Sequence, residues 1–262
     1  MGGKRAGRGR VTPLADAAAL TAAWQDKAPG RSPHVLALDW DGTLVDLAGH
    51  PDAIVVPPSL PPLLNRLHQP PDRVVLIISG RARDDLARHL PGFAGVLLGN
   101  HGAEALGTVP PVAWRRVISE WARRVPGVWL EDKGATWCVH WRAVESAARP
   151  LLLEQVQEFL DAAEDPVYLA RWGHMALDIV PRAANKGTAL AAWLQRHIGA
   201  DWRHQALVAA LGDDATDEDL FQVVDPQGLA VQVGEREPTR AVFRLPNPAA
   251  ARRWLAERAV VE

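Results

Sequence analysis

The chain has 262 residues and a formal net charge of −2, with 48% hydrophobic and 23% charged residues. This length predicts about two globular domains, and the balanced charge provides no field that would attract nucleic acid or an anionic membrane. No apolar run reaches the length of a membrane span, and the basic N-terminus lacks the apolar segment of a signal peptide. The single cysteine, Cys138, excludes an internal disulfide and fits a reducing compartment. We therefore expect a soluble, cytoplasmic protein.

The first part of the chain alternates between strand-like and helix-like patterns. We expect residues 1–30 to form a disordered tail and an Ala-rich helix, the helix covering 14–25. Further along, apolar and amphipathic patterns predict strands at 35–39, 73–78 and 94–98 and helices at 59–68 and 82–90. Strands that alternate with helices are typical of a parallel sheet covered by helices on both faces.

The pattern changes over residues 108–181. Two helices are expected there, each followed by a pair of short strands that form hairpins around residues 132–134 and around Gly173. This order departs from the alternation on either side, and we interpret 108–181 as an inserted domain. The flanking segments, 31–107 and 182–262, would then form one catalytic core.

After residue 181 the α/β pattern resumes. A helix is expected to start near Lys186, strands to cover 206–211 and 229–233, and a last helix to cover 248–260. Asn247 is the expected N-cap of that last helix. The fold is therefore predicted as α/β, with a doubly wound parallel-sheet core and an inserted α/β domain.

Polar side chains follow three of the predicted core strands. Asp39 and Asp41 follow the first strand, Ser79 follows the second, and Asp213 follows the strand at 206–211. Because parallel strands end at the same edge of a sheet, we expect these groups to converge. Carboxylates suit Mg²⁺, whereas a hydroxyl suits phosphate oxygens. The set predicts a phosphoryl-transfer site with an Asp nucleophile.

The carboxylates can be given separate roles in this chemistry. Asp39 would attack phosphorus, and Asp41 would protonate the leaving alkoxide and later take a proton from water. Asp39, the main-chain carbonyl of Asp41, and Asp213 would hold Mg²⁺. Lys186, at the start of a helix, would balance charge on the nucleophile and the phosphate.

Each group also has a simpler structural explanation. Ser79-Gly80 could form an ordinary turn, and Lys186 could be solvated. Asp214 and Asp217, which are candidates for supporting the metal ligands, could instead cap a helix and meet its dipole. Because these explanations must hold independently at each strand end and helix start, we favour the catalytic interpretation.

Several motifs resemble those of a known superfamily. DWDGT from Asp39, Ser79-Gly80-Arg81, Lys186 and GDDATDED from Gly212 resemble, in order, the motifs of haloacid dehalogenase (HAD) superfamily phosphatases. GNHGAE (99–104), LEDKGATWCVHWR (130–142), NKGTAL (185–190) and VQVG (231–234) look like those of trehalose-6-phosphate phosphatases. The resemblance implies a Rossmann-like, Mg²⁺-dependent core, with the insert as a mobile cap that recognises the sugar.

The resemblance also implies substrate-binding residues. Those on the core are Gly80, Arg81, Asn100 and His101, and those on the cap are Glu131, Lys133, Arg142 and Asp178. Strand alternation separates an apolar face around Trp137, which should pack on the cap helices, from a polar face around His140. In the last cap strand, many relatives have Glu where this chain has Asp178, and Arg where it has Val180.

Together these features predict a Mg²⁺-dependent phosphatase that hydrolyses trehalose 6-phosphate through an aspartyl phosphate. We expect it to act as a monomer, with a small sugar phosphate as its partner and no nucleic acid or membrane. Another sugar phosphate, of sucrose or glucosylglycerol, is the nearest alternative. A phosphoacceptor signalling domain would not need the inserted cap, and a silent binding protein would not need the intact acids.

Overall fold

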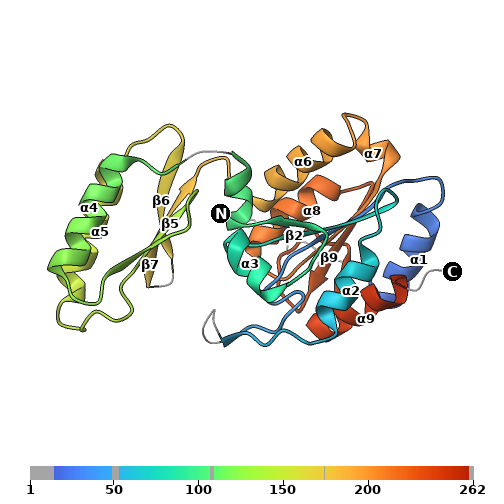
Figure 1. The fold of residues 1–262 in the computed structure, drawn as a ribbon, viewed down its shortest axis with the longest axis horizontal. Coiled ribbons are helices and arrows are strands. Elements are labelled where there is room, and N and C mark those ends of the chain that lie inside the picture. The colour runs from blue at the N-terminus through green and yellow to red at the C-terminus, as the bar shows by residue number, and fades with distance from the viewer. Residues whose placement is uncertain (1–14, 49–52, 107–108, 174, 260–262) are drawn as a thin grey trace, which may run out of the picture.

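A parallel β-sheet lies at the centre of the structure, a computed structural model that describes residues 15–48, 53–106, 109–173 and 175–259 (Figure 1). In the described residues its strands follow the order β10-β9-β8-β1-β2-β3. They are β1 (His34–Leu38), β2 (Arg73–Ile78), β3 (Val96–Leu98), β8 (Leu207–Gly212), β9 (Leu229–Val233) and β10 (Phe243–Leu245). All neighbouring strands of this sheet pair in parallel.

The strands of this sheet are apolar on both faces because helices cover both. In β1, Leu36 and Leu38 belong to one buried cluster, whereas Val35 and Ala37 belong to another on the opposite face. The first cluster is covered by α1 (Ala17–Lys27), α2 (Leu60–Leu67), α3 (Arg83–His89) and α9 (Pro248–Arg258). The second is covered by α6 (Lys186–His197), α7 (Trp202–Gln205) and α8 (Glu218–Val224). We call this sheet with these helices the core.

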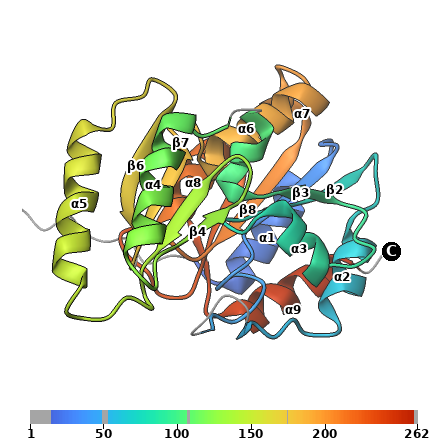
Figure 2. The same ribbon diagram turned by 60° about the vertical axis from the view of Figure 1, so that its left-hand side comes forward.

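A second, antiparallel sheet stands beside the core, with strand order β4-β5-β7-β6 in the described residues (Figures 1 and 2). Its elements are α4 (Val112–Arg124), β4 (Trp129–Asp132), β5 (Trp137–His140), α5 (Arg149–Ala162), β6 (Tyr168–Gly173) and β7 (Ala176–Pro181). Both helices lie on the face of this sheet that is turned away from the core (Figure 1). We call this unit the cap.

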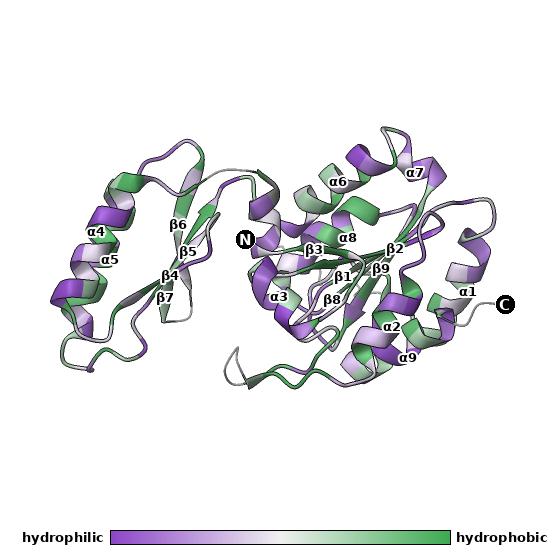
Figure 3. Ribbon diagram, in the orientation of Figure 1, coloured by the Kyte–Doolittle hydropathy of each residue, from purple (hydrophilic) through white to green (hydrophobic). Residues whose placement is uncertain are grey.

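Alternation along the cap strands explains why only one face carries helices. Trp137 and Val139 of β5 and Leu177 and Ile179 of β7 pack with the helices in a buried cluster. The neighbouring residues along each strand point the other way, toward the core. Figure 3 shows the result, since α4 and α5 each carry a hydrophobic and a hydrophilic side.

The predicted α/β class with a parallel-sheet core is confirmed. Strands β2 and β9 have the expected ends, and the ends of the other predicted core elements differ by at most three residues. Asn247 caps α9, because its Oδ1 accepts a hydrogen bond from the amide of Ala250 at 2.9 Å. The sequence patterns missed α7, α8 and β10, which are short, and a pair of 3₁₀ turns, at Asn100–Leu106 and Ala215–Asp217. The predicted tail over residues 1–14 and the predicted domain boundary at residue 108 lie outside the described residues.

No helix in the described ranges is long and apolar enough to cross a membrane.

Candidate active site

The carboxyl ends of β1, β2 and β8 meet at one cavity. Asp39 and Asp41 follow β1, Ser79 follows β2 and Asp213 follows β8, and these three strands are neighbours in the sheet. All four residues line a cavity of about 460 Å³, together with Lys186 from the start of α6. The strand order reverses direction at β1, and ligands of open α/β sheets bind at such a point.

A buried lysine links two carboxylates at the base of this cavity. Nζ of Lys186 donates to Oδ1 of Asp39 at 2.7 Å and to Oδ1 of Asp217 at 2.8 Å. The three residues are at most 4% exposed. Asn185 starts α6 with a side-chain cap on the amide of Thr188, which fixes where the helix begins and hence where Lys186 stands.

Asp217 holds the loop after β8 in place. Its Oδ2 accepts hydrogen bonds from the amides of Asp213 and Asp214, both at 3.0 Å. The side-chain amide of Gln232 in β9 donates to the carbonyl of Asp213 at 2.8 Å. With one oxygen bound to Lys186 and the other to two amides, Asp217 is occupied in positioning Lys186 and Asp213.

The turn after β1 lies directly against the side chain of Asp213. Gly42 adopts φ of +79°, and the carboxylate of Asp213 fills the space that a Cβ at Gly42 would need. Only glycine allows both this backbone conformation and this close approach. Oγ1 of Thr43 lies 3.5 Å from Oδ1 of Asp213.

Burial and mutual repulsion shift the pKa values of the acids in this cluster. Burial raises the pKa of Asp39, although Lys186 opposes the shift. Burial and the neighbouring Asp39 and Asp214 raise the pKa of Asp213 to about 7. Burial and Asp39 likewise raise the pKa of Asp217. Burial alone would lower the pKa of Lys186, but its two ion pairs outweigh that effect and raise it.

These residues fit a divalent metal ion. Oxygens of Asp39, Asp213 and Asp217 lie within 4.8 Å of one another. Hard carboxylate ligands suit small divalent cations. One lysine does not balance the buried Asp39 and Asp217 together with the half-buried Asp213. Asp214 also lines the cavity, but it accepts hydrogen bonds from the amide and hydroxyl of Thr216, at 2.7 Å each.

Asp41 is held by an arginine. Nε and one terminal nitrogen of Arg81 donate to the two oxygens of Asp41, at 2.7 and 2.8 Å. The other terminal nitrogen donates to Asp85 in α3 at 2.8 Å. Burial would raise the pKa of Asp85, but the hydrogen bonds from Arg81 and Arg88 lower it.

The other core residues predicted to bind substrate surround Ser79. Oγ of Ser79 accepts a hydrogen bond from the amide of Arg81 at 3.1 Å. Gly80 and His101 line the cavity, and the His101 ring fills the space where a Cβ at Gly80 would stand. Asn100 is buried instead, and its amide nitrogen donates to Glu104 at 2.8 Å and to the carbonyl of Lys133 in the cap at 3.3 Å. Asn100 thus links core and cap.

Of the four cap residues predicted to bind substrate, two line the cavities next to the core and two do not. Glu131 and Lys133, whose charged atoms are 3.4 Å apart, line a second cavity of about 760 Å³ between the cap and α3. Lys133 also lines the first cavity, so the two spaces adjoin. Asp178 and Arg142 line neither cavity, and Arg142 is exposed beyond the end of β5.

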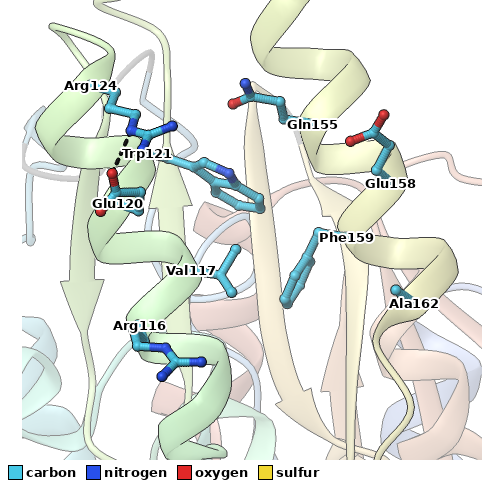
Figure 4. A pocket seen from close by; sticks show the side chains of 9 residues that line it. All are labelled: Arg116, Val117, Glu120, Trp121, Arg124, Gln155, Glu158, Phe159 and Ala162. Atoms are coloured by element: carbon cyan, nitrogen blue, oxygen red, sulfur yellow. Dashed lines mark ion pairs between the residues drawn. The ribbon is translucent and has the colours of Figure 1, made fainter.

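A third hollow, of about 630 Å³, lies on the outer side of the cap between α4 and α5 (Figure 4). Its apolar floor comes from Val117, Trp121 and Phe159, with charged groups such as Glu120 and Arg124 at the rim. The strand-end carboxylates do not line it, so it is separate from the candidate active site.

Sequence reasoning missed several residues that hold the site. Asp85 lies four residues after Arg81, a spacing at which charged side chains meet along a helix, so this ion pair could have been anticipated. Gln232 is a polar residue inside an otherwise apolar strand, which is an indication of a buried hydrogen bond. Thr43 and Glu104 lie within the motifs DWDGT and GNHGAE, but no role was predicted for either residue.

Comparisons with known proteins agree with this geometry. A family model described as Trehalose-phosphatase matches residues 37–109 and 111–249. A Sinorhizobium fredii protein named "Probable trehalose-phosphate phosphatase" is 35% identical over 242 residues, which is 86% of this chain and 88% of that protein. The trehalose-6-phosphate phosphatase of Escherichia coli is 30% identical over 237 residues, 83% of each chain. The solved C-terminal domain of C. albicans trehalose-6-phosphate phosphatase shares the fold with a TM-score of 0.72 at 20% identity, covering 95% of this chain and 98% of that one.

Proposed function

Because the chain belongs to the trehalose-phosphatase family, we propose that it hydrolyses trehalose 6-phosphate to trehalose and phosphate with Asp39 as the nucleophile. The observation that carries the proposal is the strand-end cavity, in which Asp39 is paired with a buried lysine beside a second carboxylate, Asp213. Such a site can form and break an acyl phosphate, because the lysine and a bound cation would together favour the ionised nucleophile.

We propose that Asp39, the carbonyl of Asp41, and Asp213 hold Mg²⁺. The support is the excess of buried acid and the raised pKa of Asp213. Bound there, the ion would neutralise charge on the carboxylates and on the phosphate of the substrate.

The residues of the chain account for each proton and bond. Asp39 attacks phosphorus, the phosphate ester bond breaks, and an aspartyl phosphate forms on Asp39. Asp41 donates a proton to the departing sugar oxygen, then takes one from the water that attacks the aspartyl phosphate. The proton taken from water returns Asp41 to its acid form for the next cycle, and each cycle requires the release of Asp41 from Arg81. The contact with Lys186 favours the ionised form of Asp39 before it attacks and after the acyl phosphate is hydrolysed.

We propose that the cap recognises the sugar through Glu131 and Lys133, which line the cavity next to the carboxylates. Asn100 and the carbonyl of Lys133 hold this hairpin over the core. The domain limits of 31–107 with 182–262 and of 108–181 stay predictions, as do a monomeric state and a cytoplasmic location. The absence of nucleic acid or membrane partners is likewise a prediction.

A different sugar phosphate is the second candidate, because Asp178 and Arg142 line neither cavity. The test measures phosphate release from trehalose 6-phosphate, sucrose 6-phosphate, glucosylglycerol phosphate and glucose 6-phosphate, each with Mg²⁺ and with a chelator. We expect trehalose 6-phosphate to have the highest kcat/KM and every activity to be lost with the chelator. Equal turnover of all four sugars would contradict the substrate assignment, and activity that survives chelation would contradict the metal assignment.

A further inference from the structure

Three side chains of different metal-ligand types meet on the open face of the cap sheet. They are Glu131 in β4 and Cys138 and His140 in β5. One ligand atom from each lies within 4.8 Å of the others. This cluster is separate from the Asp39–Asp213–Asp217 cluster in the core.

Strand pairing brings these residues together. Glu131 pairs with Cys138 across the β4–β5 ladder, and His140 lies two residues further along β5, so all three project from one face. The Trp129 ring, paired across the ladder with His140, stacks on the imidazole at 4.1 Å between centroids and 19° between planes. This stacking limits the rotation of the imidazole, so one ligand is already oriented.

One ion would bind a single nitrogen of His140. Nε2 of His140 lies 2.9 Å from Oε2 of Glu131, whereas the opposite nitrogen, Nδ1, lies 3.9 Å from Sγ of Cys138. In tetrahedral Zn²⁺ sites, the usual metal–nitrogen and metal–sulfur lengths put nitrogen and sulfur about 3.5 Å apart. Because the three ligand atoms already lie within 4.8 Å of one another, binding requires the side chain of Glu131 or Cys138 to turn toward the nitrogen that the ion uses.

An ion can reach this cluster from solvent. Glu131 and His140 line the cavity of about 760 Å³ between cap and core, and Cys138 lies buried beside them. A site with three protein ligands leaves a fourth position for water or a ligand hydroxyl, as in open zinc sites.

We propose that Glu131, Cys138 and His140 form a binding site for a borderline-soft divalent cation of the Zn²⁺ or Cd²⁺ class. Thiolate and imidazole ligands favour such ions over Mg²⁺, whereas the carboxylate cluster of the core favours Mg²⁺. The proposed cap site would thus prefer Zn²⁺ or Cd²⁺, whereas the core site would prefer Mg²⁺.

Charged groups next to the cluster affect its affinity for a cation. Nζ of Lys133 lies 3.4 Å from Oε2 of Glu131 and has to move aside when the cation binds. Asp178 pairs across the sheet with Cys138 and adds negative charge next to it. Burial raises the pKa of the Cys138 thiol, so binding has to release that proton to solvent as the metal–sulfur bond forms.

A cation held there would occupy Glu131. On the proposed function, which assigns Glu131 to the sugar, Zn²⁺ would therefore inhibit by excluding the substrate. Binding itself is independent of that assignment and can be measured without turnover.

The test titrates the Mg²⁺-saturated protein with CdCl₂ and follows the ultraviolet charge-transfer absorption of a cadmium–thiolate bond. Since Cys138 is the single cysteine of the chain, such a band reports this thiol alone. We expect a one-to-one band that ZnCl₂ displaces. Cys138→Ser should abolish it, and His140→Gln should weaken Cd²⁺ binding by about 10–100-fold, which is the loss typical of disturbing a metal site.

Two controls separate the site from its alternatives. Asp39→Asn should keep the band, because the core cluster is not involved. Cys138→Ser, assayed without Zn²⁺, should keep the phosphatase activity of the unmodified protein and show a folded circular dichroism spectrum. The proposal is overturned if no band forms, or if His140→Gln binds Cd²⁺ as tightly as the unmodified protein, which would mean simple thiol capture. Neither result depends on which sugar phosphate the enzyme accepts.

Discussion

Arg81 binds both carboxylate oxygens of Asp41, at 2.7 and 2.8 Å, and is itself tied to Asp85. This two-point contact fixes the orientation of the carboxylate that is proposed as the acid of the first step. Arrival of a phosphate ester would offer the guanidinium of Arg81 an alternative anion and free Asp41.

Replacing Asp41 should affect the chemical step. We expect Asp41→Asn to lower kcat about 10²–10⁴-fold, because an amide cannot transfer the proton that a general acid supplies. Asp85→Asn is the matched control, since it loosens Arg81 but leaves Asp41 intact, and its effect should be less than about tenfold. Steady-state phosphate release measures both. An Asp41→Asn variant with unchanged kcat would remove Asp41 from the mechanism.

Removing the buried lysine should cost stability. Lys186→Met leaves Asp39 and Asp217 buried without their cation. Breaking a buried ion pair in this way typically destabilises a protein by about 3–5 kcal/mol. Urea unfolding of the metal-free protein measures the loss, with Lys27→Met as the control, because Nζ of Lys27 reaches only the carbonyls of Pro226 and Gln227. If the two variants were equally stable, the ion pairs of Lys186 would not support the fold.

Alanine variants of Gly42 and Gly92 should distinguish the cost of a strained backbone from the cost of a steric clash. Gly42 and Gly92 have φ of +79° and +73°, but a Cβ at Gly42 meets the carboxylate of Asp213, whereas a Cβ at Gly92 meets nothing within 4 Å. Both alanine variants should lose about 1–2 kcal/mol from the left-handed backbone. Gly42→Ala should in addition weaken metal binding, because Asp213 is displaced. Calorimetric titration with Mg²⁺ tests this, and equal Mg²⁺ affinity in the two variants would show that the contact at Gly42 is unimportant.

The metal-free protein should lose stability as pH rises through the range in which Asp213 ionises. The pKa of Asp213 is raised from 3.8 to about 7, mainly by burial and by Asp39. The folded state therefore binds more protons than the unfolded state between these values, and the free energy of unfolding falls as pH rises from about 4 to 7. Thermal melts in chelator should show a shallower pH dependence for Asp213→Asn than for the unmodified protein. Identical slopes would contradict the raised pKa.

The core was more predictable from the sequence than the cap surface. Apolar runs such as 75–78 are buried on both faces, so their pattern alone identifies strands. Polar residues directly after such runs were expected at one edge of the sheet. The same reasoning does not reveal that Asp217 accepts hydrogen bonds from Lys186 and from the amides of Asp213 and Asp214. These contacts depend on the path of the loop after β8. β10 has three residues and α7 has four, which is too short to show a period.

Side-chain contacts across the two units were also beyond the sequence. The amide nitrogen of Asn100, a predicted substrate-binding residue, contacts Glu104 and the cap carbonyl of Lys133. Arg142 comes two residues after the end of β5, in a turn, and is exposed. A sequence motif shows that these residues are present, but their contacts depend on where the strands and turns end.

The most direct test of the account is the rate of phosphate release from trehalose 6-phosphate, measured with saturating Mg²⁺ for the unmodified protein and for Asp39→Asn. Asparagine keeps the size of the side chain but cannot form the acyl phosphate, so we predict a loss in kcat of about 10³-fold or more. Circular dichroism and melting temperature confirm that the variant is folded. An Asp39→Asn protein that retains activity within about tenfold of the unmodified enzyme would contradict the assignment of Asp39 as the nucleophile.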